Sequence, residues 1–142
     1  MKLVIASDHA GYAYKEEVKK FLAEKGHEVK DVGTHSTESC DYPIFAKEAA
    51  KEVAEKRAQF GILICSSGEG IMMAANKVKG VRAGLAYNDD VARLMRQHNN
   101  ANMIAFGANF MKLEDVKNRI EIFLKTGFEG GRHERRVNEI EE

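Results

Sequence analysis

The sequence predicts an α/β fold, a single doubly wound and Rossmann-like domain, and three observations support this. Short β-branched apolar runs alternate with stretches of helical spacing along the whole chain. Such alternation implies parallel strands joined by right-handed crossovers, with helices on both faces of one sheet. The length of 142 residues suits one domain, and we find no repeat, linker or low-complexity segment. We therefore expect one domain over residues 1–142, with a five-stranded parallel sheet and a C-terminal helical tail.

The first half of the chain supplies three strands and two helices. The expected elements are strand 2–7, helix 12–25, strand 27–32, polar loop 33–42, helix 43–56 and strand 60–65. The first strand is β-branched and ends at a Ser-Asp-His step, and the last of these strands is the most apolar. The first helix places Val18, Phe21 and Leu22 on one face before Gly26 stops it. The only proline, Pro43, starts the second helix, where its missing N–H costs little.

The second half continues the alternation. The expected elements are helix 70–77, strand 81–87, helix 89–97, strand 103–106, helix 113–125 and the tail 130–142, which follows Gly127. The strands are again short and apolar, so each can lie buried between two layers of helices.

The composition excludes several classes of partner. The chain has 22 basic and 22 acidic side chains, a balance that argues against a nucleic acid or an anionic membrane. Hydrophobic residues make up 44%, as in an ordinary globular core. The longest apolar runs, such as Ile62–Cys65, fall far short of the roughly 20 residues that span a bilayer. The N-terminus has no secretory layout and two cysteines form no disulfide framework, so we expect a cytoplasmic protein.

Polar residues gather where the strands of the predicted sheet end. Residues 8–9 follow the first strand, residues 34–42 the second, residues 65–68 the third and residues 87–89 the fourth. Open α/β sheets bind their ligands at the carboxyl ends of the strands. We therefore expect a functional site at this edge.

The strongest local signal is the turn Cys65–Ile71, which follows a buried strand and opens a helix. Its small residues let a ligand approach the backbone, and the N–H groups at a helix start favour an anion. A tight turn without a ligand is the plain alternative. The turn lacks the G-x-G-x-x-G spacing of a dinucleotide site and the Gly-Lys-Ser/Thr of a Walker loop. It is best interpreted as an anion-binding turn that begins with a thiol.

Cys65 has two interpretations. A lone cysteine is usually a small buried hydrophobe. The position just before a helix N-terminus, however, favours the reactive thiolate form of a cysteine. Cys40 lies in a polar loop without such surroundings, and we expect it to be a bystander.

Asp8 and His9 follow the first strand, where an Asp could simply cap the next helix. A phosphoacceptor site would need an acidic pair here and an Asp after the third strand, which instead ends in Cys65. As metal ligands the two residues lack a third partner, because His27, His35 and His133 are scattered without ligand spacing. We expect no metal.

His98 ends the fourth predicted helix, within a run of polar residues. A C-terminal cap is its plain interpretation, and an acid/base group is the functional one. Residues that precede the fifth strand lie at the amino edge of the sheet, opposite Cys65. If the two side chains act together, His98 has to come from a second subunit.

The tail opens with twin glycines and a basic cluster. Arg132 and Arg136 are four residues apart and share a helix face. A solvated terminal helix is the plain interpretation. Two guanidinium groups on one face also suit a phosphate dianion, and the glycines could fold the tail back over a site.

Six segments together resemble the type B ribose-5-phosphate isomerases, a family that includes the galactose-6-phosphate isomerase subunits. The segments are SDHAGY (7–12), the Asp41-Tyr42-Pro43 step, ILICSSGEGIMMAANK (62–77), RQHNNAN (96–102), AFG (105–107) and EGGRHERR (129–136). The resemblance covers essentially the whole chain, with the motifs in the family's order.

The resemblance implies a role for each matching residue. Cys65 would be the general base, Ser67 would handle protons on the substrate oxygens, and Asp8 and His98 would open the furanose ring. The loop that would hold the enediolate includes Ser66, Gly68 and Gly70; the phosphate-binding set is His9, Arg132 and Arg136, with Tyr42 and Asn99 lining the sugar pocket. The family needs no cofactor and works as a dimer with shared sites, which agrees with the placement of His98.

Two positions differ from the pattern of many members. One branch carries a catalytic Glu directly after the last loop glycine; here Ile71 stands there and Glu69 does not replace it, so the resemblance is to the cysteine branch. Many members carry an Arg in an FG-x-R pattern, where this chain has Asn109. That change implies one cation fewer at the phosphate.

The expected function is therefore the interconversion of ribose 5-phosphate and ribulose 5-phosphate through a cis-enediolate. Isomerisation of galactose 6-phosphate or allose 6-phosphate is the alternative within the class. A non-catalytic sugar-phosphate-binding protein is the alternative from another class, although a binder needs neither Cys65 nor His98. We expect a homodimer or a tetramer.

Overall fold

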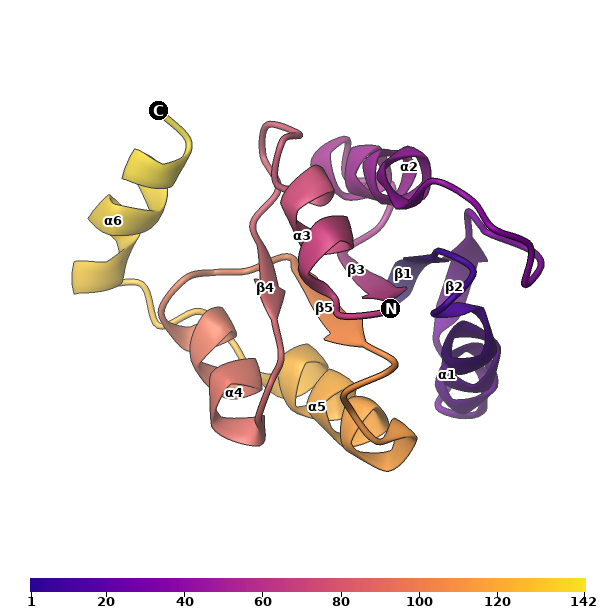
Figure 1. Ribbon diagram of the computed structural model, residues 1–142. Helices are drawn as coiled ribbons and strands as arrows, with labels where there is room; N and C mark the ends of the chain where they lie inside the picture. The colour runs from indigo at the N-terminus through magenta and orange to yellow at the C-terminus, as the bar shows by residue number, and fades with distance from the viewer.

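The computed structural model describes residues 1–142 as a five-stranded parallel sheet between layers of helices (Figure 1). The elements are β1 (Lys2–Ser7), α1 (Tyr12–Glu24), β2 (Glu28–Asp31), α2 (Tyr42–Ala54), β3 (Phe60–Cys65), α3 (Glu69–Ala75), β4 (Ala83–Leu85), α4 (Asp89–Gln97), β5 (Met103–Gly107), α5 (Leu113–Lys125) and α6 (Arg132–Ile140). The predicted fold class is confirmed.

The strand order, β2-β1-β3-β5-β4, is that of a doubly wound sheet. The chain moves outward from β1 to β2 and then crosses back, so β3 pairs with the other side of β1. This reversal is the switch point at which open α/β sheets form a ligand crevice. The carboxyl ends of β1 and β3 therefore bring residues 8–9 and 65–66 side by side.

Two apolar layers cover the sheet. One holds Ile5 and Ile64 of the sheet against Val18, Ile120 and other residues of α1, α4 and α5. The second holds Leu63 and Ala105 against the alanines of α2 and α3, among them Ala49. The central strands are apolar on both faces, as the sequence pattern predicts for buried parallel strands.

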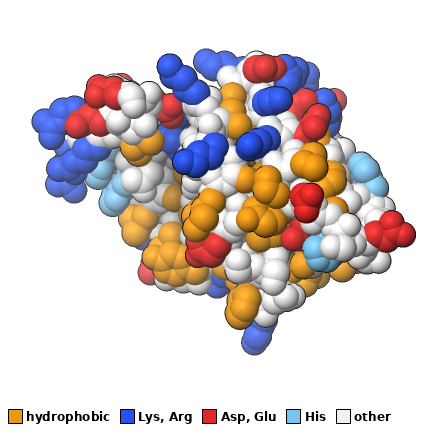
Figure 2. Space-filling view, turned by 45° about the horizontal axis from the view of Figure 1, so that its top comes forward, with side chains coloured by type: hydrophobic (Ala, Val, Ile, Leu, Met, Phe, Trp, Pro, Cys, Tyr) orange, Lys and Arg blue, Asp and Glu red, His pale blue; other side chains and the backbone are white.

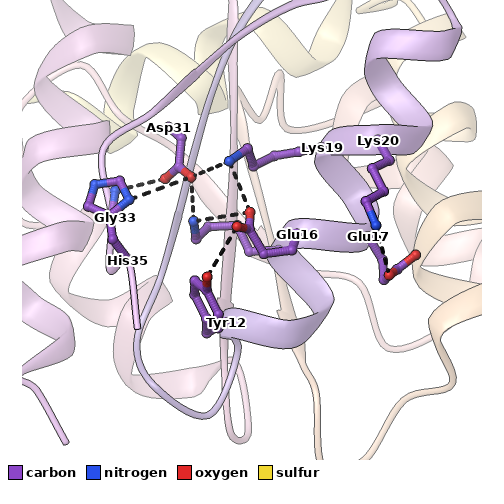
Figure 3. A network of polar contacts seen from close by, with 9 residues as sticks. Tyr12, Glu16, Glu17, Lys19, Lys20, Asp31, Gly33 and His35 are labelled. Carbon is purple, nitrogen blue, oxygen red and sulfur yellow. Dashed lines mark hydrogen bonds and ion pairs between the residues drawn. The ribbon is translucent and has the colours of Figure 1, made fainter. Parts of the chain in front are cut away.

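A buried cation fixes the outer edge beside β2. Lys15 is fully buried and pairs with Asp31, which also accepts a hydrogen bond from Lys19 at 2.8 Å (Figure 3). The second oxygen of Asp31 accepts the backbone N–H of Gly33 at 2.9 Å. The network thus holds the start of the loop 33–41, which leads to α2 at the carboxyl end of the sheet.

The C-terminal helix α6 lies apart from the layered body, next to β4 (Figure 1). Glu141 at its end pairs with Arg82 at 2.7 Å and accepts the N–H of Gly80 at 3.0 Å. A cavity of about 470 Å³ separates α6 from the body and is lined by Arg82, Met95 and Ile140, among others. No helix of the structure is both long enough and apolar enough to cross a bilayer.

Candidate active site

The turn after β3 forms the centre of the candidate site. Cys65 is 4% exposed, and its Sγ accepts the backbone N–H of Gly68 at 3.1 Å. This is a hydrogen bond that a thiolate accepts more strongly than a thiol. The turn therefore aims a backbone donor at the sulfur.

The shape of this turn depends on glycine. Gly68 adopts a φ of +86°, which side chains disfavour, and a Cβ there would lie 2.8 Å from the backbone carbon of Phe106. A Cβ on Gly107 would lie 2.4 Å from the carbonyl oxygen of Ser67. The turn is packed directly on the end of β5, so its position is fixed by backbone contact.

Several amides of the turn remain free. The N–H groups of Ser67, Gly70 and Ile71 donate to no acceptor within the chain. The N–H of Glu69 donates to the Ser67 hydroxyl at 3.2 Å. Free donors on a fixed turn suit a negatively charged oxygen, as the sequence predicted for an anion-binding turn.

Asp8 and His9 lie at the neighbouring end of β1. Asp8 is buried and accepts the N–H of Gly11 at 3.0 Å, which closes the turn before α1. The N-cap of α1 is Gly11 and no side chain caps this helix, so the capping interpretation of Asp8 is wrong. Nδ1 of His9 accepts the N–H of Cys40 at 3.3 Å, and the Cys40 sulfur lies 3.8 Å away. Cys40, expected to be a bystander, thus positions the His9 ring, a contact that no sequence spacing reveals.

Tyr42 and Asn109 complete this group. A Cβ on Gly70 would lie 2.6 Å from Cζ of Tyr42, which places the half-exposed tyrosine ring against the turn. Asn109 donates from Nδ2 to the Ser66 hydroxyl at 2.6 Å. Asn109, the position at which the resemblance implied a missing cation, therefore holds the turn.

The other predicted residues lie elsewhere. His98 caps the C-terminal end of α4, before β5 starts at Met103. Met103 pairs with Gly61 and Gly107 with Cys65, so the two ends of β5 are about 13 Å apart, at 3.3 Å per residue. The placement of His98 at the amino edge, away from Cys65, is thus confirmed.

Asn99, Arg132 and Arg136 belong with His98. Asn99 follows it in the chain, and α6 carries both arginines, which are exposed and make no ion pair. The His98 and His133 rings stack, with centroids 4.2 Å apart. Burial and then the neighbouring charge of His98 lower the pKa of His133 from its ordinary value. Figure 2 shows histidines beside blue Lys and Arg side chains at the edge that α6 forms.

The structure therefore divides the predicted residues into two groups. The first group, at the carboxyl end, is Asp8, His9, Tyr42, Cys65, Ser66, Ser67, Gly68 and Gly70; the second group is His98, Asn99, Arg132 and Arg136. None of the four cavities of the chain is lined by Cys65. Within one chain, the turn has no enclosing wall.

Comparison with known proteins gives a consistent result. The chain matches the ribose/galactose isomerase family over residues 3–140. It is 43% identical to ribose-5-phosphate isomerase B of Escherichia coli over 98% of this chain and 93% of the relative.

Solved structures agree with this match. The enzyme of the same name from Clostridium thermocellum superposes with a TM-score of 0.98 at 45% identity, covering 99% of this chain and 95% of the other. That of Mycoplasma genitalium, solved with bound ribulose-5-phosphate, superposes with a TM-score of 0.95 at 41% identity, covering 99% and 93%.

Proposed function

The chain belongs to the ribose/galactose isomerase family, and from this premise we propose that it interconverts D-ribose 5-phosphate and D-ribulose 5-phosphate, with Cys65 as the general base. The relatives named ribose-5-phosphate isomerase B match the chain from end to end. The observation that carries the catalytic assignment is the Cys65 sulfur, held by the Gly68 amide within a turn of free N–H donors.

The reaction moves one proton between adjacent carbons of the sugar. In the open-chain aldose, the Cys65 thiolate takes the C2 proton, and the C–H electron pair forms the C1–C2 double bond of a cis-enediolate. The thiol then returns the proton to C1, while the Ser67 hydroxyl passes a proton between O1 and O2. Electrons are redistributed within the substrate, so the chemistry needs no external oxidant or cofactor.

The free amides of the turn stabilise the negative charge that develops on the enediolate oxygens. Loss of one such donor typically slows a reaction by about 100- to 1,000-fold. The glycines of the turn therefore contribute as much as the base, because they hold the donors where the oxygens will lie.

A homodimer with shared sites accounts for the two groups of residues. The second group of one chain would face the Cys65 turn of its partner, where Arg132 and Arg136 would bind the phosphate, His98 with Asp8 would open the ring, and Asn99 would contact the sugar. The exposed apolar side chains of Tyr42, Ile44 and Met73 give α2 and α3 a surface for pairing. Figure 2 shows hydrophobic side chains gathered near the middle of one face.

The proposed compartment is the cytoplasm. Cys65 has to remain reduced to act as a base, and both cysteines are free thiols. The proposed ligand is a small sugar phosphate.

The activity test uses the purified protein in the presence of a metal chelator, with ribose 5-phosphate, galactose 6-phosphate and allose 6-phosphate as substrates. We expect turnover of ribose 5-phosphate. Cys65→Ser should lose at least about 100-fold in kcat, the ordinary contribution of a general base. Cys40→Ser should stay active, because serine keeps the backbone N–H that donates to His9. Turnover of a hexose phosphate alone would assign the chain a different substrate. No turnover on any of the three would favour the alternative of a non-catalytic sugar-phosphate-binding protein.

The shared site has a sharper test. Cys65→Ser and His98→Asn chains are mixed, dissociated and reassociated. Half of the dimers then contain one chain of each kind, and in each of these one site has both groups intact. We expect about a quarter of wild-type activity from two inactive proteins, since a two-fold dimer has two equivalent sites. No recovery would exclude a site shared in this way.

A further inference from the structure

Three side chains of metal-binding type converge beside α6, outside the Cys65 turn. His98, Glu129 and His133 each present one ligand atom, and these atoms all lie within 4.8 Å of one another. They come from the end of α4, the loop between α5 and α6, and the first turn of α6. The sequence separates His98 from the other two by 31 residues or more, so spacing alone does not reveal the cluster.

Backbone hydrogen bonds fix the three positions. The N–H of Glu129 donates to the carbonyl of Gln97 at 3.1 Å, which ties the loop to the end of α4. Gly130 and Gly131 then turn the chain with φ values of +66° and +54°. The N–H of His133 donates back to Gly130 at 3.0 Å, so this turn returns the histidine toward Glu129.

One distance in the cluster is already close to that of a coordination sphere. Nε2 of His98 lies 3.5 Å from Oε1 of Glu129. In a tetrahedral zinc site with bonds of about 2.1 Å, neighbouring ligand atoms are about 3.4 Å apart. The His98 and His133 rings are stacked, with centroids 4.2 Å apart and 14° between their planes, and imidazole lone pairs lie in the ring plane. One ring therefore has to rotate out of the stack before both nitrogens face one ion.

Two imidazoles and one carboxylate select the kind of ion. This donor set suits Zn²⁺, whereas Mg²⁺ and Ca²⁺ prefer oxygen ligands alone. Glu129 is exposed and both histidines are half-buried, so an ion and a fourth ligand can reach the cluster. The charges of Arg132 and Arg136 on the same helix oppose a cation, and we expect a Kd in the micromolar range, about 8 kcal/mol of binding free energy.

We propose that His98, Glu129 and His133 form a Zn²⁺ site, and that zinc bound there inhibits the enzyme by withdrawing His98 from the reaction. A ring nitrogen that donates its lone pair to zinc cannot accept a proton. The inhibitory half rests on the proposed function of His98, whereas the site itself rests on geometry alone. Zinc here would be a ligand that switches the enzyme off.

The binding test titrates Zn²⁺ into the metal-free, full-length protein at pH 7.5, followed by calorimetry, with Mg²⁺ as a comparison. We expect one Zn²⁺ per chain and no uptake of Mg²⁺. His133→Phe keeps a flat ring on His98, and Glu129→Gln keeps the shape of the side chain. Each should weaken zinc binding at least tenfold, about the loss seen on changing a supporting residue.

His35→Phe is the matched control, because it makes the same exchange at a side chain that is 71% exposed and distant from the cluster in sequence. It should bind zinc like the wild type. Cys65→Ser should also bind zinc unchanged. Zinc that binds equally well to His133→Phe, or that is lost with Cys65→Ser, would overturn the site.

The activity test measures isomerisation with and without zinc at saturating occupancy. We expect zinc to slow the wild type and His35→Phe at least tenfold, and to leave His133→Phe near its zinc-free rate. Zinc bound at the cluster with undiminished turnover would overturn the inhibition and keep the metal site. A protein inactive without zinc would instead contradict the proposed function, and the calorimetry would still decide the site.

Discussion

The two ends of the sheet are built in different ways. At the carboxyl end, Asp8 and Cys65 are 6% and 4% exposed, and glycines pack the turn directly on neighbouring backbone. At the other end, Arg132 and Arg136 are exposed on a helix that stands apart from the body. One end is preorganised within the chain, whereas the other presents charges outward.

This difference matches the two kinds of work that the proposed reaction needs. Proton transfer requires groups fixed to within fractions of an ångström, and a packed turn supplies that precision. Phosphate binding tolerates longer and more flexible side chains, because charge acts over several ångströms. Residues supplied to a partner have to be exposed in the single chain.

The largest expected effect comes from disturbing the packed turn. In Gly107→Ala the new Cβ would lie 2.4 Å from the Ser67 carbonyl oxygen, so the turn has to move away from β5. We expect kcat to fall about 1,000-fold, because the free amides leave their positions together. Gly127→Ala is the control, since a Cβ there meets nothing within 4 Å. Gly107→Ala with normal turnover would show that the turn is not preorganised by this contact.

The next largest fall in kcat should come from a change at the amino end of the sheet. His98→Asn removes the proposed ring-opening group, and we expect about a 100-fold fall in kcat from ribose 5-phosphate. The loss should be smaller from ribulose 5-phosphate, because that ketose is acyclic and needs no ring opening. Initial rates in both directions measure the difference. Equal losses on both substrates would assign His98 a different role.

A third prediction concerns Arg96, a buried residue that holds the C-terminal end of α4. Arg96 is buried, donates to the carbonyls of Thr126 and Ala101, and lies over the Phe60 ring at 4.8 Å. Arg96→Met should cost about 3 kcal/mol in the free energy of unfolding, because it leaves these carbonyls unpaired.

Arg93 on the same helix is the control for that experiment. It is 44% exposed and pairs with an Asp90 that is 78% exposed, so Arg93→Met should change stability by less than about 1 kcal/mol. Urea unfolding measures both variants. Similar losses for the two would mean that burial of Arg96 does not anchor the end of α4.

The sequence predicted the elements best where apolar runs are bounded by turn residues. The strands Lys2–Ser7 and Phe60–Cys65 and the helices Asp89–Gln97 and Leu113–Lys125 occur with the predicted bounds. Strand 81–87 was predicted too long, and only Ala83–Leu85 pairs. β4 is an edge strand and pairs with β5 alone. The residues on either side of Ala83–Leu85 therefore belong to the connecting turns.

The site was predictable in its residue types and only partly in its contacts. The position of Cys65 before a helix was visible in the sequence, because strand, turn and helix are continuous there. The contacts of Cys40 with His9 and of Glu129 with His98 were not, because they join segments that lie 31 residues apart. Long-range pairs of single polar residues leave no periodic pattern.

The smallest expected effect is an acid sensitivity confined to the β2 edge. Burial raises the pKa of Asp31, but the hydrogen bonds from Lys15, Lys19 and Gly33 outweigh it and lower the pKa below its ordinary value. A carboxyl with a lowered pKa in the folded protein contributes stability above the unfolded pKa of about 3.9, and loses it as pH falls through the folded value.

Amide exchange at Gly33, whose N–H donates to Asp31, reports this loss directly. We expect its protection to stay constant from pH 6 to about 4 and to fall below that, as the start of the loop that leads to Tyr42 loosens. In Asp31→Asn the amide oxygen still accepts the bond, so protection should be lower but independent of pH over this range. Protection that already falls near pH 6 would show that a group other than Asp31 controls this amide.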